Sequence, residues 1–211
     1  MIKAIFWDND GVLVDTERLY FQATQAVMAT AGVALTQAQY VELFIVQGGG
    51  GWHLVADKGY SAAEVERLRD ERNARYSAML DQEHLVIEGV HDVLRALRGN
   101  YMMGIVTSSR TDHFNRIHRQ TKLLPYFEFV LARSDYVQSK PHPEPYLLAI
   151  ARSGFAPDEC VVIEDSERGL AAATAAGLKC FVVPNALTKG CKFVGAHNVL
   201  TRISELLPAL G

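Results

Sequence analysis

Two aspartates separated by a single residue follow the first apolar segment of the chain. Asp8 and Asp10 belong to the run Asp8-Asn9-Asp10-Gly11-Val12, directly after the mostly apolar residues 3–7. One carboxylate can attack a phosphorus atom, and a second carboxylate two residues away can protonate the leaving oxygen and then activate water. Turns are also rich in Asp and Gly, so this run taken alone is only a weak indication of catalysis.

Three further sets of polar residues stand at equivalent places in the sequence pattern. Thr107-Ser108 ends a second apolar run, Lys140 precedes a proline-stiffened helix start, and Glu164-Asp165 ends another apolar run. Ligands of an open α/β sheet bind beyond the carboxyl ends of its strands, so these groups are expected at one sheet edge together with the two aspartates. Chance placement of all four sets is improbable, and together they form a strong signal.

Phosphoryl transfer is the chemistry that suits this combination. Four carboxylates cannot share a cleft without a neutralising cation, and Mg²⁺ prefers carboxylate and carbonyl oxygen ligands. A lysine, hydroxyl groups and a metal ion stabilise charge on a transferring phosphoryl group. The residue set therefore predicts Mg²⁺ as the cofactor and a small phosphorylated metabolite as the substrate.

The elements that must position these residues alternate between short apolar runs and helical patterns. The apolar runs show little period-two alternation, as in strands that are buried on both faces of a parallel sheet. Predicted strands cover residues 3–7, 102–107, 129–132, 160–164 and 180–183, and predicted helices cover residues 89–98, 111–120, 143–153 and 167–176. This succession predicts an α/β fold with a doubly wound parallel sheet.

One long interval after the first strand lacks any convincing strand pattern. It shows helical patterns at residues 17–31 and 61–80, the second opened by the capping box Ser61-Ala62-Ala63-Glu64. An all-helical insertion carried on two linkers is typical of a small second domain. We expect a catalytic core formed by residues 1–14 and 85–211 and an inserted helical cap domain at residues 15–84.

Composition excludes several other classes of protein. The chain has 211 residues, of which 49% are hydrophobic and 21% charged, and its formal net charge is −3. No apolar run approaches the roughly 20 residues that cross a bilayer, and the net charge gives no overall attraction to nucleic acid or anionic lipid. Three cysteines without close pairing fit a reducing cytoplasm, and the start of the chain leaves no room for a secretion signal. We expect a cytoplasmic monomer or weak dimer without nucleic-acid or membrane partners.

Taken together, the motifs resemble those of the haloacid dehalogenase superfamily of phosphohydrolases. The closest likeness is to the branch that contains β-phosphoglucomutase and sugar-phosphate phosphatases. The residues that carry the resemblance are 8–17, 106–109, 140–146 and 163–166. The likeness extends over essentially the whole chain, and it implies a Rossmann-like core with the first strand central and a helical cap.

The resemblance also implies individual catalytic roles. Asp8 corresponds to the nucleophile and Asp10 to the general acid and base. Thr107 corresponds to the residue that binds the transferring phosphoryl group, with Ser108 beside it as a further contact. Lys140 corresponds to the lysine that bridges the phosphoryl oxygens and the nucleophile.

The same resemblance implies a set of Mg²⁺ ligands. These are Asp8, the backbone carbonyl of Asp10, Asp165 and, as a further candidate, Glu164. An alternative interpretation remains open at the last motif, because Asp165 and Ser166 are also residue types that cap the start of a helix.

Arg72 interrupts the apolar stripe of the second cap helix, between Leu68 and Tyr76. Either its stem packs while its charged end reaches solvent, or its guanidinium binds an anionic substrate. Arg72-Asn73 lies close to where the mutase has a lysine–asparagine pair, which supports the second interpretation.

Tyr20 and His53 are the other candidate substrate-binding residues of the cap. Tyr20 lies where β-phosphoglucomutase has a histidine that helps couple cap closure to proton transfer. The run Gly48-Gly49-Gly50-Gly51 lies where the mutase has an arginine for the second phosphate. The glycines followed by Trp52 predict either a mobile loop that approaches a ligand or an interhelical turn that the indole anchors.

Hydrolysis by a phosphatase is the leading hypothesis, because both cap differences weigh against a mutase. A phosphomutase of the β-phosphoglucomutase type is the first alternative. A non-catalytic binding module on the same fold is the second, although a decayed enzyme would have lost part of the site. Among the remaining polar residues, Arg116, His118 and Arg119 are predicted to form the solvated face of the helix at 111–120.

Overall fold

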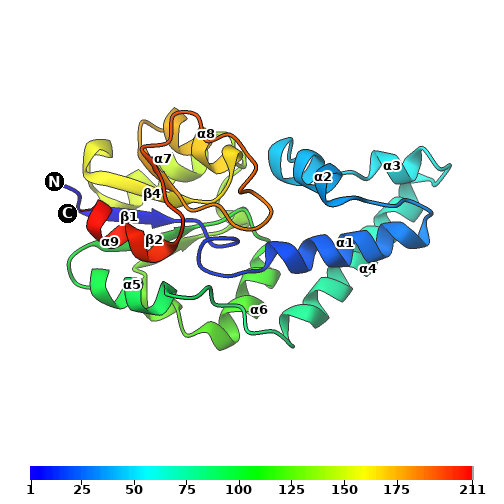
Figure 1. Ribbon diagram of the computed structural model, residues 1–211, viewed down its shortest axis with the longest axis horizontal. Coiled ribbons are helices and arrows are strands. Elements are labelled where there is room, and N and C mark those ends of the chain that lie inside the picture. Colours follow the sequence, from blue (N-terminus) through cyan, green and yellow to red (C-terminus); the bar gives the residue numbers. More distant parts are fainter. Residues whose placement is uncertain (211) are drawn as a thin grey trace. The chain divides into compact units, whose positions relative to one another are not determined.

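The computed structural model describes residues Met1–Leu210, which form two compact units (Figure 1). The first unit combines Met1–Asp15 with the chain from Leu85 onward, and the second unit is Thr16–His84. Among the described residues, none of the helices has the length and apolar character needed to cross a membrane.

A parallel sheet of six strands in the order β3-β2-β1-β4-β5-β6 forms the centre of the first unit. The strands are β1 (Ala4–Trp7), β2 (Met102–Val106), β3 (Phe129–Leu131), β4 (Cys160–Glu164), β5 (Lys179–Val182) and β6 (Asn198–Val199). The predicted doubly wound α/β fold is confirmed, and each of the five predicted strands is present. Strand β6 was not predicted, because it has only two residues, both exposed, and leaves no apolar pattern in the sequence.

Helices cover both faces of this sheet, and α7 and α8 lie on the opposite side from α5 (Figure 1). Helices of the first unit are α5 (Val90–Leu97), α6 (Thr111–Thr121), α7 (Glu144–Ser153), α8 (Glu167–Ala175) and α9 (Leu206–Ala209). Short 3₁₀ helices lie at Leu124–Tyr126, Arg133–Asp135, Pro157–Glu159 and Ile203–Glu205.

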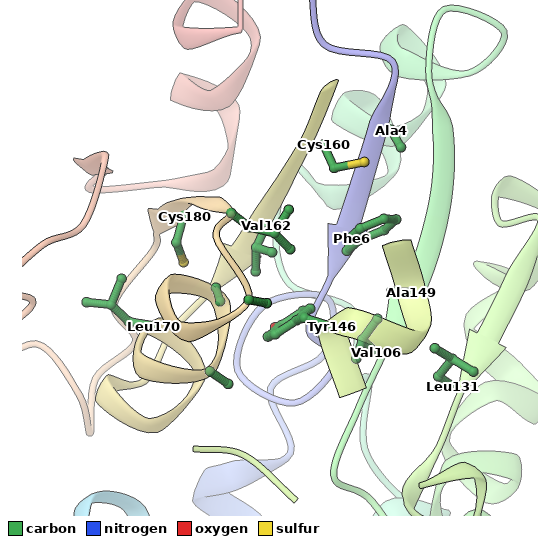
Figure 2. Packing of buried hydrophobic residues seen from close by; sticks show 14 of the residues in the cluster. Ala4, Phe6, Val106, Leu131, Tyr146, Ala149, Cys160, Val162, Leu170 and Cys180 are labelled. Atoms are coloured by element: carbon green, nitrogen blue, oxygen red, sulfur yellow. The ribbon is translucent and has the colours of Figure 1, made fainter. Parts of the chain in front are cut away.

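The residues of β1 show why the strands lack alternation. Ala4 and Phe6 belong to the hydrophobic cluster between the sheet and helices α7 and α8, which includes Tyr146 (Figure 2). Ile5 and Trp7 point to the opposite face, and they are fully buried as well. Because both faces are covered, every position of the strand is apolar.

The strand order brings the ends of β2, β1 and β4 side by side. Trp7 at the end of β1 pairs with Ile105 on one side and with Ile163 on the other. The residues that follow these three strands therefore leave the sheet at one edge. Three of the predicted polar motifs, at Asp8, Thr107 and Glu164, lie there.

The second unit, residues 16–84, is described in full, and its regular elements are all helical. Its elements are α1 (Glu17–Thr30), α2 (Gln37–Tyr40), a π-helical segment (Val41–Val46), α3 (His53–Ala56) and α4 (Ala62–Leu80). Helices α1 and α4 pack against each other. The predicted capping box is present, because the Ser61 side chain accepts from the Glu64 N–H and the Glu64 side chain accepts from the Ser61 N–H.

Gly104 is the one small residue in the middle of β2, and its lack of a side chain makes room for an aromatic ring. It pairs with Phe6 on β1 and with Phe129 on β3, whose ring centroids lie 6.1 Å apart. A Cβ atom on Gly104 would overlap the Phe129 ring. The Phe129 ring can therefore take its place beside Phe6 because position 104 is glycine.

We predict that Gly104→Ala lowers the free energy of unfolding by about 1–3 kcal/mol, because the added methyl group overpacks the core. Gly190→Ala is the matched control, since a Cβ there meets no atom within 4 Å and its backbone does not need a positive φ. Urea unfolding at constant m-value measures both. Equal stability of the two variants would contradict the packing argument.

Candidate active site

Lys140 holds the ends of three neighbouring strands together. Its ammonium donates to Asp8 Oδ1 at 2.7 Å, to the Val106 carbonyl at 2.8 Å and to Glu164 Oε1 at 2.6 Å. These acceptors follow or end β1, β2 and β4, and together they use all three donors of the ammonium. Burial alone would lower the pKa of Lys140, but Asp8 and Glu164 raise it above its ordinary value, so the group stays charged.

Asp8 lies directly beyond β1, and its backbone N–H donates to the Ile163 carbonyl at 2.9 Å. Its side chain is largely buried. The pKa of Asp8 is raised to about 8, because burial and the nearby carboxylates of Glu164 and Asp10 outweigh the opposing charge of Lys140. A divalent cation beside Asp8 would favour the ionised form, which a nucleophilic carboxylate requires.

The carboxylate of Asp10 is held mainly through one oxygen. Asp10 Oδ2 accepts from Ser109 Oγ at 2.5 Å, from Thr107 Oγ1 at 3.2 Å and from Asn9 Nδ2 at 3.2 Å. These three donors are neutral groups, and they orient the carboxylate. Asp10 and Thr107, both predicted as site residues, are therefore in direct contact.

The Thr107-Ser108-Ser109 loop beyond β2 is fixed by a buried tyrosine. Tyr136 donates its hydroxyl to the Thr107 carbonyl at 2.7 Å, and the Ser109 N–H donates to Thr107 Oγ1 at 3.0 Å. Thr107 is buried, whereas Ser108 lies 3.5 Å from the Tyr136 hydroxyl and is exposed. The loop thus presents hydroxyl groups beside Asp10.

Glu164 is fully buried at the end of β4, and both of its oxygens accept hydrogen bonds. Oε1 accepts from Lys140 and from the Tyr146 hydroxyl, each at 2.6 Å. Oε2 accepts from the Asp165 N–H at 3.2 Å and from Ser166 Oγ at 3.1 Å. This set of partners explains how the carboxylate is tolerated in the core.

Asp165 is oriented by a loop that follows β5. Asn185 Nδ2 donates to Asp165 Oδ2 at 2.6 Å, while Asn185 Oδ1 accepts from the N–H groups of Leu187 and Thr188. Gly11, at φ +87°, leaves space for this pair, because a Cβ there would overlap Asp165. The Asp165 carboxylate therefore has room beside Gly11 and is oriented by Asn185.

The side chains of Asp8, Glu164 and Asp165 form a possible cation site. One oxygen from each lies within 4.8 Å of the others, and all three residues are buried. Carboxylate oxygens are the ligands of a hard cation such as Mg²⁺, so the residues present fit such an ion. Helix α8 is capped by Ser166, whose hydroxyl accepts from the Gly169 N–H, so Asp165 is not the capping side chain.

The prediction for His118 was wrong. Its side chain is buried and forms hydrogen bonds with Asn9 and Thr121, whereas Arg119 is exposed and Arg116 is partly exposed. Position 118 shares the buried face of α6 with Phe114, whose ring lies 4.4 Å from the imidazole. The spacing of residues along the helix is compatible with His118 on the buried face. The prediction of the solvated face was based on histidine being a polar residue.

Of the candidate residues of the helical unit, Arg72 and Tyr20 contact each other, whereas His53 is exposed. The guanidinium of Arg72 is buried, lies 4.2 Å from the centre of the Tyr20 ring and 5.5 Å from that of Trp52, and donates to Thr24. Arg72 and Tyr20 thus contact each other, and the exposed-head interpretation of Arg72 is wrong. His53 begins α3 and is exposed, and the buried Trp52 anchors the turn after the glycines.

Several contacts at the site were not predicted from the sequence. Ser109, Tyr146, Asn185 and the Asn9–His118 pair each bind a residue of the predicted site. Ser109 and Asn9 lie inside the motifs themselves, so their positions gave a signal. Tyr146 is the last residue of the lysine motif, whereas Asn185 stands in a loop without any pattern.

Comparison with known proteins identifies relatives over the whole chain. A family model described as haloacid dehalogenase-like hydrolase matches residues 5–183. Protein CbbY of Cereibacter sphaeroides is 32% identical over 219 residues, covering 98% of this chain and 94% of the relative. A phosphorylated carbohydrates phosphatase of Thermotoga maritima is 28% identical over 216 residues, covering 99% of this chain and 98% of the relative. The structure of CbbY from Rhodobacter sphaeroides in complex with xylulose-(1,5)bisphosphate has a TM-score of 0.80 and 26% identity, and the match covers 98% of this chain and 96% of that one.

We predict that Gly169→Ala reduces both stability and activity. Alanine normally stabilises a helix by about 1 kcal/mol relative to glycine, but a Cβ at position 169 would overlap the Glu164 carboxylate. The displaced carboxylate would then lose Lys140. Adding Glu164→Asp shortens that side chain, so the double variant should be more stable than the sum of the single effects allows. Strict additivity in urea unfolding would show that the overlap is not the cause.

We predict that His118 makes folding pH-dependent below neutrality. Burial lowers the pKa of His118 to about 4, although the charge of Asp10 opposes this effect. The unfolded chain takes up the proton near pH 6.5, so stability is complete above that pH and falls by about 3 kcal/mol as the pH drops to about 4. The free energies of unfolding of wild type and His118→Gln should therefore differ most at pH 7 and converge as the pH falls to 4. Parallel curves would contradict the assignment of a neutral buried imidazole.

Proposed function

Because the chain belongs to the haloacid dehalogenase-like hydrolase family, we propose that it is a Mg²⁺-dependent phosphatase with an aspartyl-phosphate intermediate on Asp8. The observation that carries this proposal is the 2.7 Å contact between Lys140 Nζ and Asp8 Oδ1 at a sheet edge that also holds Asp10. A nucleophile, a cation and a second carboxylate are the groups that stepwise hydrolysis of a phosphoric monoester requires.

In the first step an oxygen of Asp8 attacks the phosphorus of the substrate, and the bond from phosphorus to the leaving oxygen breaks. Asp10 in its protonated form donates its proton to that leaving oxygen, which departs as an alcohol. Lys140 and the Thr107 hydroxyl stabilise negative charge on the phosphoryl oxygens. The phosphoryl group is then covalently bound to Asp8.

In the second step Asp10, now ionised, removes a proton from a water molecule. The resulting hydroxide attacks the phosphorus, the bond to Asp8 breaks, and inorganic phosphate leaves. Asp8 is again a free carboxylate, and Asp10 is again protonated. One carboxylate therefore serves as the acid of the first step and the base of the second.

A divalent cation fits the acidic residues at this edge. We propose that Asp8, Asp165 and the backbone carbonyl of Asp10 hold it, since Asp8 and Asp165 belong to the buried acidic group. Glu164 also offers an oxygen to this group, but its four hydrogen bonds favour a role as the partner of Lys140. A bound Mg²⁺ supplies positive charge that offsets the carboxylates and the phosphoryl oxygens.

The substrate class that we propose is a sugar phosphate. Two similarities support it: the Thermotoga maritima relative is a phosphorylated carbohydrates phosphatase, and the CbbY structure holds a sugar bisphosphate. In the helical unit, Tyr20, His53 and Arg72 remain our candidates for substrate contacts. We favour hydrolysis over phosphomutase activity, because the Tyr20 side chain packs against Arg72 and Tyr76 rather than supplying an imidazole.

A panel of phosphorylated sugars tests the substrate class and the reaction type together. With Mg²⁺ the enzyme should release inorganic phosphate from at least one sugar phosphate without a bisphosphate activator, and chelation should abolish this release. Formation of an isomeric sugar phosphate in place of inorganic phosphate would instead support a mutase.

We predict that Asp10→Asn converts hydrolysis of p-nitrophenyl phosphate into a single burst. The nitrophenolate leaves without a proton, so Asp8 is still phosphorylated, but water attack loses its base and turnover falls by about 10²–10⁴-fold. Stopped-flow absorbance should show one nitrophenolate per enzyme molecule, followed by slow release.

Two further variants complete this experiment. Asp8→Asn should give neither burst nor turnover, whereas Asp92→Asn on the exposed face of α5 should behave as wild type. Turnover retained by Asp8→Asn would overturn the proposed nucleophile, and the absence of a burst in Asp10→Asn with full turnover would overturn the proposed role of Asp10.

A further inference from the structure

A row of buried polar side chains connects α6 to the candidate acid and base. His118 Nδ1 lies 2.8 Å from Thr121 Oγ1, and His118 Nε2 lies 2.8 Å from Asn9 Oδ1. The amide nitrogen of Asn9 then donates to Asp10 Oδ2 at 3.2 Å. His118 is separated from Asn9 by 109 positions in the sequence, so the contact exists only in the folded core.

The hydrogen-bond directions in this row follow from chemistry. An amide oxygen can only accept, so His118 Nε2 must carry the hydrogen that it donates to Asn9. In a neutral imidazole Nδ1 is then an acceptor, and the Thr121 hydroxyl donates to it. Burial, which lowers the pKa of His118 to about 4, is consistent with the neutral form.

The orientation of Asn9 depends on this imidazole. If the amide were turned over, its oxygen would face the Asp10 carboxylate, which is a repulsive contact, and His118 would have to move its hydrogen to Nδ1 to accept from the amide nitrogen. The backbone of Asn9 is fixed as well, because its carbonyl accepts from the N–H groups of Leu13 and Val14 at 2.9 and 3.1 Å. Asn9 is fully buried and is therefore aimed at Asp10 in one orientation.

Asn9 also differs from the other donors to Asp10. Thr107 and Ser109 are on the loop beyond β2, where we place the phosphoryl group, so their hydroxyls can turn to the substrate. The amide of Asn9 is held from behind by His118 and stays on Asp10. Its contact with Asp10 can therefore persist when phosphate occupies the loop.

We propose that His118 is a positioning residue for the reaction, acting through Asn9 to hold the carboxylate of Asp10 in the orientation from which it exchanges protons. This inference rests on the proposed function, because it requires Asp10 to be the acid and base. It adds a buried residue of α6, outside the four sequence motifs, to those on which the reaction depends.

The consequence is a dependence on the leaving group. A misplaced Asp10 protonates a leaving oxygen poorly, which matters for a basic leaving group and little for an acidic one. Phenyl phosphate releases a phenol with a pKa of about 10, whereas p-nitrophenyl phosphate releases a far more acidic phenol. A variant that only weakened the fold or phosphate binding would lower kcat/KM equally for both substrates.

The experiment compares His118→Phe, which removes the donor, with His118→Gln, whose amide can still donate to Asn9. His118→Phe should lower kcat/KM for phenyl phosphate by about tenfold or more and that for p-nitrophenyl phosphate by less than about threefold. His118→Gln should stay within about threefold of wild type on both substrates. His197→Phe, at an exposed histidine, is the matched control and should change neither value.

A second pair of variants keeps the test decisive if His118→Phe folds poorly. Asn9→Leu removes the amide at similar volume and should lower kcat/KM more for phenyl phosphate than for p-nitrophenyl phosphate. Adding His118→Phe should not enlarge this difference, since both substitutions break the same row of contacts. Thr121→Val should act in the same direction with a smaller effect.

The proposal would be overturned if His118→Phe lowered kcat/KM equally for both substrates, or if folded His118→Phe showed no loss. Additive effects in the double variant would also overturn it. Failure of the proposed function looks different, since wild type would then release phosphate from neither substrate.

Discussion

The buried ammonium of Lys140 is the interaction on which the rest of the site depends. It satisfies acceptors at the ends of β1, β2 and β4 at once, at 2.6–2.8 Å. A charge in the core requires such complete pairing, and two buried carboxylates require a cation in return. The pairing of these charges depends on the order of the strands. One side chain can reach all three strand ends because β2, β1 and β4 are neighbours in the sheet. The carboxylate of Glu164 must be kept in place beside this ammonium. Tyr146 donates to it, and the absence of a side chain at Gly169 leaves room for it.

The sequence allowed much of this arrangement to be predicted, because two rules apply to it. Buried parallel strands are uniformly apolar, so β1 to β5 stand out from the helices between them. Groups that follow such strands meet at one edge, so Asp8, Thr107 and Glu164 could be placed near each other before the structure was known. The position of Lys140 was harder to predict, since this residue precedes a helix rather than ending a strand. Its contact with Asp8 was implied by resemblance to a family, and the structure brings the two side chains together.

The parts that could not be predicted are those that long-range packing decides. His118 is a polar residue type on an amphipathic helix, and its buried partner Asn9 lies in a distant loop. Nothing in the local pattern distinguishes a histidine that contacts water from one that contacts an amide. Asn185 presents the same problem, since its loop has no periodicity and its partner Asp165 lies beyond another strand. Strand β6 is too short to leave a pattern, and the burial of Arg72 depends on the aromatic rings of Tyr20 and Trp52.

Two buried bases near β1 are kept in opposite protonation states, and this difference separates the two aspartates. Lys140 stays charged because Asp8 and Glu164 surround it, whereas His118 stays neutral because burial outweighs the more distant charge of Asp10. Asp8 is therefore paired directly with a cation, which favours the ionised state that its proposed role as nucleophile needs. Asp10 Oδ2 accepts hydrogen bonds from one amide and two hydroxyls, which orient the carboxylate. The acid and base that we propose at Asp10 must face the reacting oxygen in both steps, so this orientation matters. Because the imidazole behind Asn9 is neutral, it brings no positive charge to the proposed acid and base, and it acts on Asp10 through the geometry of Asn9.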